Sequence, residues 1–157
     1  MKPRPLYPSL IGWLILLSGL FFASSCGTDD PEKQAAKDRE KIIEYLIQNN
    51  LQATELPSGV FYYIEQTGHG LFPTDSSTVI VTYTGTLLNG TQFDMGVQRQ
   101  FHLPDAIPGF RHGIPMFNRG ARGILLIPSG LAYGRSGTHT IPPNSVLIFN
   151  IEMFDWR

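Results

Sequence analysis

The dipeptide Asn89-Gly90 constrains the possible fold more strongly than any other feature of the sequence. Both residues tolerate positive φ, which tight turns between antiparallel strands require. Residues 78–88, directly before it, alternate as a half-buried strand does, with one face formed by Val79, Val81 and Tyr83. Residues 91–94 begin the returning strand. The sequence therefore predicts a β-hairpin and, with it, an antiparallel sheet.

Short strands separated by turns continue on both sides of this hairpin. Further strands are predicted at residues 60–66, 100–103, 122–127 and 146–156, and a short helix at residues 108–117. Pro115 should limit that helix to about two turns, because proline lacks the N–H that a helix interior needs. The last strand has one apolar face, formed by Leu147, Phe149, Ile151 and Met153. We expect an α+β domain over residues 57–157, an antiparallel sheet with one short helix across it.

A longer helix is predicted before this domain, over residues 32–50. Pro31 suits the first turn, and Glu32 interacts favourably with the N-terminal end of the helix dipole. Its narrow apolar stripe consists of Ile42, Ile43, Leu46 and Ile47. The stripe has two possible partners, the chain's own domain or a second copy of the chain.

The N-terminus has the features of a targeting segment. Lys2 and Arg4 precede an almost wholly apolar run at residues 10–23, which is shorter than the roughly 20 residues of a membrane-spanning helix. Such a run is typical of a signal peptide, and small residues follow it, as at a cleavage site. We therefore predict a signal peptide over residues 1–25.

The single cysteine, Cys26, comes directly after these small residues. This arrangement resembles the lipobox of bacterial lipoproteins, although Ala23 stands where that motif favours Leu. The resemblance implies that Cys26 is acylated and anchors the chain to a membrane of the cell envelope, on its periplasmic or outer-surface face. Residues 26–56 are then a lipid-anchored tether and helix. Within the tether, the polar segment 27–31 with its two aspartates resembles a surface-export signal or forms a solvated linker. The alternative is an ordinary signal peptide followed by an incidental thiol.

Several kinds of chemistry have no support in the sequence. The net charge is −1 and basic residues do not cluster, so nucleic acid is not an expected partner. The histidines are not spaced as metal ligands, so no metal site is expected; they are His69, His102, His112 and His139. We find no glycine-rich phosphate loop, nucleophile elbow or acid/base pair of carboxylates. No cofactor is therefore expected, and no covalent mechanism.

Aromatic residues instead concentrate where predicted strands meet loops, within short motifs that follow one another along the chain. These are Val81–Gly85, Gly90–Asp94, Ala106–Phe110, Gly130–Gly134 and Ile141–Phe149. In order and spacing they resemble the FKBP family of peptidyl-prolyl cis/trans isomerases over residues 57–157. The resemblance implies a twisted antiparallel half-barrel wrapped round a short helix, with a pocket between the helix and the concave face of the sheet.

The resemblance also assigns roles to residues. It implies that the catalytic residues are Tyr83, Phe93, Asp94, Ile107 and Tyr133. It implies that substrate is bound by Phe101, Ala106, Phe110, His139, Ile141 and Phe149. In this assignment the Ile107 amide and the Tyr133 hydroxyl donate hydrogen bonds to substrate carbonyls, while Asp94 is a polar group at the buried edge of the pocket.

The sequence departs from the family pattern at three places. Phe110 stands where the family often has Trp at the pocket floor, which removes an indole N–H and some contact area. The loop from Tyr133 to Ile141 is about one residue shorter than in small eukaryotic members, which leaves the register of His139 open. Arg99 is an alternative to Phe101 for the pocket-facing position.

Taken together, the resemblance implies non-covalent rotation of X-Pro bonds in unfolded or flexible polypeptides, with an apolar residue X preferred. It also implies binding of macrolides such as rapamycin or tacrolimus, more weakly if Phe110 forms the floor. The alternative functions are a binding module that keeps the fold without catalysis, and a factor belonging to a larger surface assembly.

Overall fold

The structure is a computed structural model that describes residues 30–157. The predicted signal peptide and Cys26 lie outside the described residues. The elements in chain order are α1 (Pro31–Gln48), β1 (Thr54–Glu55), β2 (Phe61–Gln66), β3 (Thr78–Leu87), β4 (Gln92–His102), η1 (Leu103–Asp105), α2 (Pro108–Gly113), η2 (Ile114–Met116), β5 (Arg122–Ile127), η3 (Ser129–Leu131) and β6 (Leu147–Trp156). Within residues 30–157, no helix has the length and apolar character to cross a membrane.

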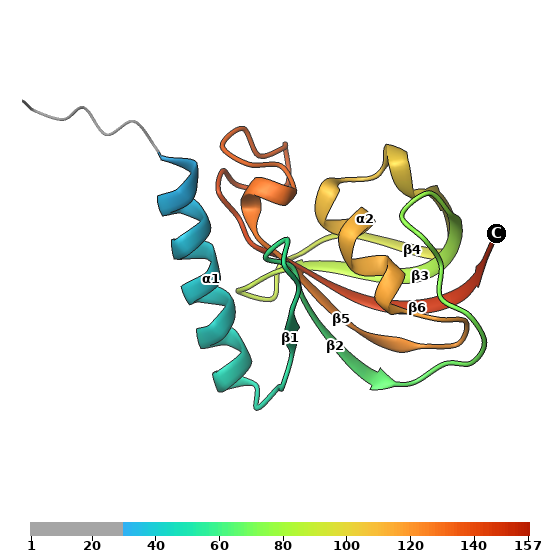
Figure 1. Cartoon of the computed structure of the whole chain (residues 1–157). Coiled ribbons are helices and arrows are strands. Elements are labelled where there is room, and N and C mark those ends of the chain that lie inside the picture. Colours follow the sequence, from blue (N-terminus) through green and yellow to red (C-terminus); the bar gives the residue numbers. More distant parts are fainter. Residues whose placement is uncertain (1–29) are drawn as a thin grey trace, which may run out of the picture.

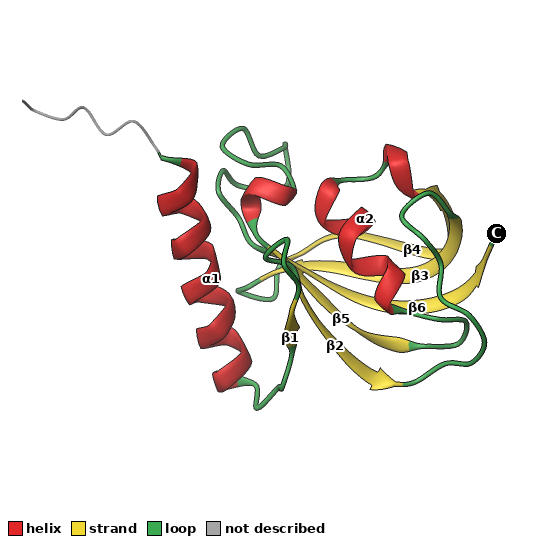
Figure 2. Cartoon of the chain, viewed as in Figure 1, coloured by secondary structure: helices red, strands yellow, loops and turns green. Residues whose placement is uncertain are grey.

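The strands form one sheet in the order β1-β2-β5-β6-β3-β4, and every neighbouring pair is antiparallel. The predicted hairpin is confirmed as the β3–β4 pair. Gly90 takes a φ of 83° at its turn, and the Asn89 side chain accepts a hydrogen bond of 3.0 Å from the Thr91 N–H. The sheet curves round α2, while α1 lies at its other side (Figures 1 and 2).

Strand β4 corrects the predicted division into two short strands at 91–94 and 100–103, because it runs without interruption from Gln92 to His102. A bulge makes this continuity possible. The register with β3 shifts between Val81 and Tyr83, opposite Gln98, which takes a φ of 48°. The Gln98 N–H leaves the regular ladder and donates to Thr82 Oγ1 at 3.1 Å. The extra residue bends the strand locally, and the strand continues beyond it.

The concave face of the sheet holds the main core, and α2 lies against it. Two glycines one turn apart allow this close approach, since a Cβ at Gly109 or Gly113 would collide with Ile127 or Leu125. The helix is shorter than the predicted 108–117, because the chain changes to a 3₁₀ turn at Ile114–Met116, around Pro115. Without an N–H, Pro115 cannot extend the α-helical ladder.

Part of the opposite face of the sheet, over β2, β5 and β6, packs against α1. A second, smaller core lies between this face and α1. Neighbouring side chains of β5 point to opposite faces of the sheet, so Leu125 belongs to the main core and Leu126 to the smaller one, with Ile42 and Leu46 of α1. Of the predicted apolar stripe, Ile42, Ile43 and Leu46 therefore pack on the chain's own domain, whereas Ile47 is 74% exposed and does not. Asn49 caps the helix, which ends at Gln48 and not at residue 50.

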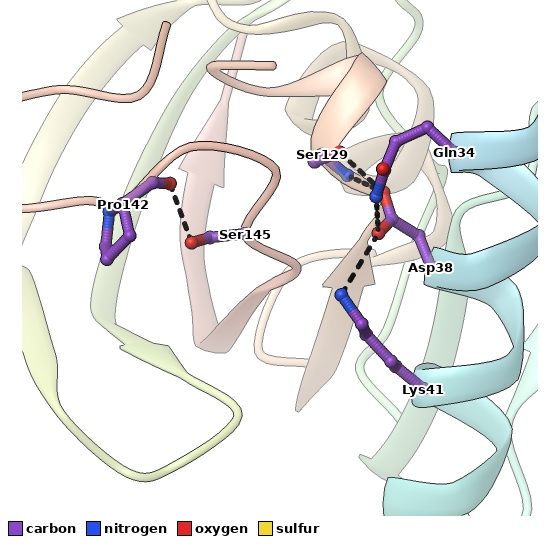
Figure 3. A network of polar contacts seen from close by, with 6 residues as sticks. All are labelled: Gln34, Asp38, Lys41, Ser129, Pro142 and Ser145. Carbon is purple, nitrogen blue, oxygen red and sulfur yellow. Dashed lines mark hydrogen bonds and ion pairs between the residues drawn. The ribbon is translucent and has the colours of Figure 1, made fainter. Parts of the chain in front are cut away.

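A buried carboxylate joins α1 to the turn η3 (Figure 3). Asp38 has no exposed surface. Its Oδ2 accepts hydrogen bonds from the Ser129 amide at 2.8 Å and from the Ser129 hydroxyl at 2.5 Å, and its Oδ1 accepts one from Gln34 at 2.8 Å. Lys41 Nζ lies 3.9 Å from Oδ1. Because Ser129 begins the turn that leads to Tyr133, this contact links the N-terminal helix to a loop of the candidate site.

Candidate active site

A pocket of about 230 Å³ lies between the concave face of the sheet and α2. The strands β3, β4 and β6 supply its aromatic side chains, and the segment from η1 into α2 supplies the opposite wall. It is lined by Tyr83, Phe93, Asp94, Phe101, Asp105, Ala106, Ile107, Phe110, Tyr133 and Phe149. Segments far apart in the sequence thus converge on one small, largely apolar cavity.

Phe110 is the centre of the aromatic lining and is only 4% exposed. Its ring centroid lies 5.2 Å from that of Phe149 and 5.4 Å from that of Phe101. The rings of Phe93 and Phe149 meet edge to face, at 5.6 Å and an interplanar angle of 87°. Such contacts fix each ring through its neighbours, so the lining is formed before any ligand arrives.

Glycines in the strands make room for two of these rings. A Cβ at Gly85 of β3 would lie 2.6 Å from Cζ of Phe93, and one at Gly96 of β4 would lie 2.7 Å from Cε1 of Tyr83. Both distances are far below van der Waals contact. A side chain at either position would therefore displace a pocket ring.

The polar edge of the pocket is a hydrogen-bonded pair. The Tyr83 hydroxyl donates to Asp94 Oδ2 at 2.7 Å, and Asp94 Oδ1 accepts from the Met95 amide at 2.8 Å. Asp94 is exposed, so it stands at the rim and not in a buried edge. Burial, and then the hydrogen bond to Asp94, raise the pKa of Tyr83 to about 12. Tyr83 therefore stays protonated and holds the carboxylate in place at neutral pH.

Two donors remain available at the pocket. Neither the Ile107 amide nor the Tyr133 hydroxyl makes a hydrogen bond to any residue in the described part of the chain. Ile107 is the N-cap of α2, and an N–H at this position has no acceptor within the helix. The Tyr133 side chain is exposed, with 40% of the residue's surface accessible. Both are free to donate to carbonyl groups of a bound peptide.

The structure brings together most of the predicted site residues and separates two of them. Phe101 faces the pocket, whereas the alternative, Arg99, is exposed and does not line it. Ile141 is 4% exposed and packs in the core, and His139 lies on the exposed surface of its loop; neither lines the pocket.

Asp105 also lines the pocket and was not predicted. Its position directly before the Ala106–Phe110 motif was the available signal. Within residues 30–157, no group of three or more His, Cys, Asp or Glu side chains is placed to hold a metal ion.

Comparison with known proteins agrees with this geometry. The sequence model of the family described as FKBP-type peptidyl-prolyl cis-trans isomerase matches residues 70–154. FkpA, a protein of that description from Escherichia coli K12, is 38% identical over 130 residues, which are 79% of this chain and 48% of FkpA. A probable FKBP-type isomerase of Haemophilus influenzae is 35% identical over 142 residues, covering 87% of this chain and 58% of the relative. The chain thus spans about half the length of these curated relatives.

Solved structures show the same fold. The crystal structure of Escherichia coli FkpA superimposes with a TM-score of 0.68 and 37% identity, covering 80% of this chain and 62% of that one. A peptidyl-prolyl cis-trans isomerase from Pseudomonas syringae pv. tomato gives a TM-score of 0.68 at 30% identity, covering 83% of this chain and 98% of that one. Fold, pocket and sequence agree, and the chain belongs to the family of FKBP-type peptidyl-prolyl cis-trans isomerases.

Proposed function

We propose that this chain catalyses cis/trans rotation about X-Pro bonds in flexible or unfolded segments of exported proteins, by a non-covalent mechanism. The observation that carries the proposal is the pocket of about 230 Å³, which has a preformed aromatic lining and carboxylates only at its rim. Its size suits a proline ring with part of the preceding residue. Proline-containing polypeptides are therefore the proposed substrates, and macrolides the proposed inhibitors.

The aromatic lining supplies the catalytic effect in this proposal. Rotation about a peptide bond has a barrier of about 18–20 kcal/mol, because resonance holds the bond planar. The planar form separates charge between oxygen and nitrogen, and water stabilises that charge. In contact with Phe110 and Phe149 the bond loses this stabilisation, whereas the twisted transition state has less charge separation and loses less. The pocket thus favours the transition state over the ground state.

Fixed donors supply the orientation. The Ile107 amide and the Tyr133 hydroxyl would hold substrate carbonyls on either side of the rotating bond, so that the proline ring stays in the pocket while the bond twists. Asp94, held by Tyr83 at the rim, faces the peptide where the charge on the imide changes. No bond to the protein forms in this mechanism.

The direct test is cis-to-trans conversion of an X-Pro peptide by the full chain, with and without a macrolide. Acceleration that the macrolide suppresses is the expected result. An unchanged rate at micromolar protein, with the peptide still bound, would instead assign the chain to the class of non-catalytic binding modules.

We further propose that Cys26 is acylated and places the domain at a membrane of the cell envelope. The support is its position after an apolar run and small residues. More than one acyl chain is needed for stable anchoring, and lipoprotein-type modification supplies it.

A further inference from the structure

A second and larger cavity, of about 1180 Å³, lies between α1 and the loop that begins with η3. We call it the helix groove. Its walls are α1 on one side, through Ala35 and Ala36, and residues 130–136 on the other, with residues 56–59 between them. Figure 1 shows α1 and the η3 loop side by side. No step of the proposed mechanism uses this space.

We propose that the helix groove binds the polypeptide that flanks the proline, so that the protein acts on extended segments and not only on the X-Pro pair. This inference rests on the proposed function and specifies its substrate. The helix groove adjoins the pocket, because Tyr133 lines both. A polypeptide advances about 3.3–3.6 Å per residue when extended, so a chain that passes Tyr133 enters the groove within a few residues of its proline.

The helix groove is about five times as large as the pocket. The pocket can hold little more than a proline ring, so the rest of a substrate must lie elsewhere. The groove exceeds the roughly 300–1,000 Å³ that is usual for small-molecule sites. It therefore has room for several residues of a polypeptide.

The groove surface suits a peptide backbone with small apolar side chains. Ala35, Ala36, Pro57 and Leu131 line it, and no atom lies within 4 Å of the position that a Cβ on Gly130 would occupy, so the backbone there is open. A polypeptide docked there would meet small apolar side chains and accessible backbone.

The charges of the groove favour a neutral segment. Arg39 of α1 and Glu55 of β1 both line it and neutralise one another through hydrogen bonds of 2.8 to 3.1 Å. The remaining charged side chain of the wall, Arg135, is also engaged in an interaction. A strongly acidic or basic ligand would have no uncompensated charge to bind.

The test compares a short X-Pro peptide with one that carries the same X-Pro between neutral extensions of several residues. Ala35→Trp fills the groove from an exposed helix position without touching the core. We expect it to lower kcat/KM for the long peptide by about tenfold, which corresponds to about 1.4 kcal/mol of lost binding, and to change the short peptide's value by less than about twofold. Ala36→Trp should reproduce the effect. Lys37→Trp is the matched control, since it adds the same ring at an exposed position outside the groove and should change neither value.

Each outcome is decisive. Equal losses for both peptides, or no loss with the long peptide, would overturn the inference. A changed oligomeric state of Ala35→Trp in sedimentation would assign the groove to a second copy of the chain and would also overturn it. If the wild-type chain does not accelerate the short peptide, the proposed function fails; the groove is then tested by fluorescence anisotropy with a labelled long peptide, which Ala35→Trp must weaken.

Discussion

Removing the buried carboxylate of Asp38 should destabilise the protein strongly, although the residue lies outside the candidate pocket. Asp38→Ala eliminates both bonds to Ser129 and leaves that residue's N–H and O–H without an acceptor. A hydrogen bond to a charged group contributes about 1.5–3 kcal/mol, and a buried donor without a partner costs about 1–3 kcal/mol. The cost of desolvating the carboxylate is recovered in the variant and offsets part of this loss. We expect a net loss of about 3 kcal/mol, which lowers Tm by about 10 °C in a domain of this size.

Three related variants separate the contributions of the charge, the Ser129 hydroxyl and the Lys41 ion pair to this loss of stability. In Asp38→Asn the amide oxygen can still accept from Ser129, and the amide nitrogen can donate to Gln34 if the Gln34 amide rotates. The free energy of unfolding should therefore fall by only about 1 kcal/mol, close to the contribution of one neutral hydrogen bond. Ser129→Ala removes only the hydroxyl bond and should lie between the two Asp38 variants. Lys41→Met is the control, because its exposed ammonium lies 3.9 Å from the carboxylate, and such pairs contribute about 0–1 kcal/mol.

Urea denaturation followed by circular dichroism gives the free energies of unfolding, and hydrogen exchange of the Ser129 amide reports the contact directly. A free energy of unfolding for Asp38→Ala within about 1 kcal/mol of the wild type, or an equal loss in Lys41→Met, would contradict the role assigned to this carboxylate.

Three further predictions concern the pocket and the anchor. Phe93→Ala and Asp94→Ala should each lower kcat/KM for an X-Pro peptide by about tenfold or more, equivalent to about 1.4 kcal/mol, with a small change in Tm; activity that survived both substitutions would rule out this pocket as the active site. Because the pKa of Tyr83 is raised in the folded state from 10.0 to about 12, its contribution to stability is complete below pH 10 and is lost as the pH rises towards 12. Urea midpoints at pH 9 and pH 11 should therefore differ less in Tyr83→Phe than in the wild type, and an equal drop in both would contradict the assigned pKa. Cys26→Ala should move the protein from the membrane fraction to the soluble fraction of expressing cells, and a variant that stays with membranes would count against acylation.

The sequence predicted the elements that local chemistry determines. Asn89-Gly90 located the hairpin because few residues adopt the backbone of a tight turn, and alternation along residues 147–153 located the faces of the last strand. The continuity of β4 was missed because Gly96 and the polar residues around it interrupt the alternation that marks a strand. The bulge at Gln98 depends on pairing with Thr82, a partner distant in sequence.

The candidate site was predicted where its residues stand in compact motifs and was missed where position depends on loop conformation. Phe93, Asp94, Ile107 and Phe110 lie at the ends of regular elements, so the motif fixes their direction. His139 and Ile141 lie in a long loop whose path no local pattern sets.

The burial of Asp38 is predictable from its position in the helix. Asp38 stands four and eight residues before Ile42 and Leu46, and so on the apolar face of the helix. A carboxylate in that stripe indicates a buried partner. The partner itself, and the helix groove beside it, follow only from how α1 docks on the sheet.

If Cys26 is acylated, the start of α1 at Pro31 limits how far the domain can lie from the membrane. Five residue steps separate the two positions, so even a fully stretched connection reaches no more than about 18 Å. Since Pro31 itself lines the helix groove, the groove mouth would stay within this short range of the bilayer surface. The proposed substrate chains would then have to reach the membrane surface to bind, and those emerging from it or lying along it would have first access.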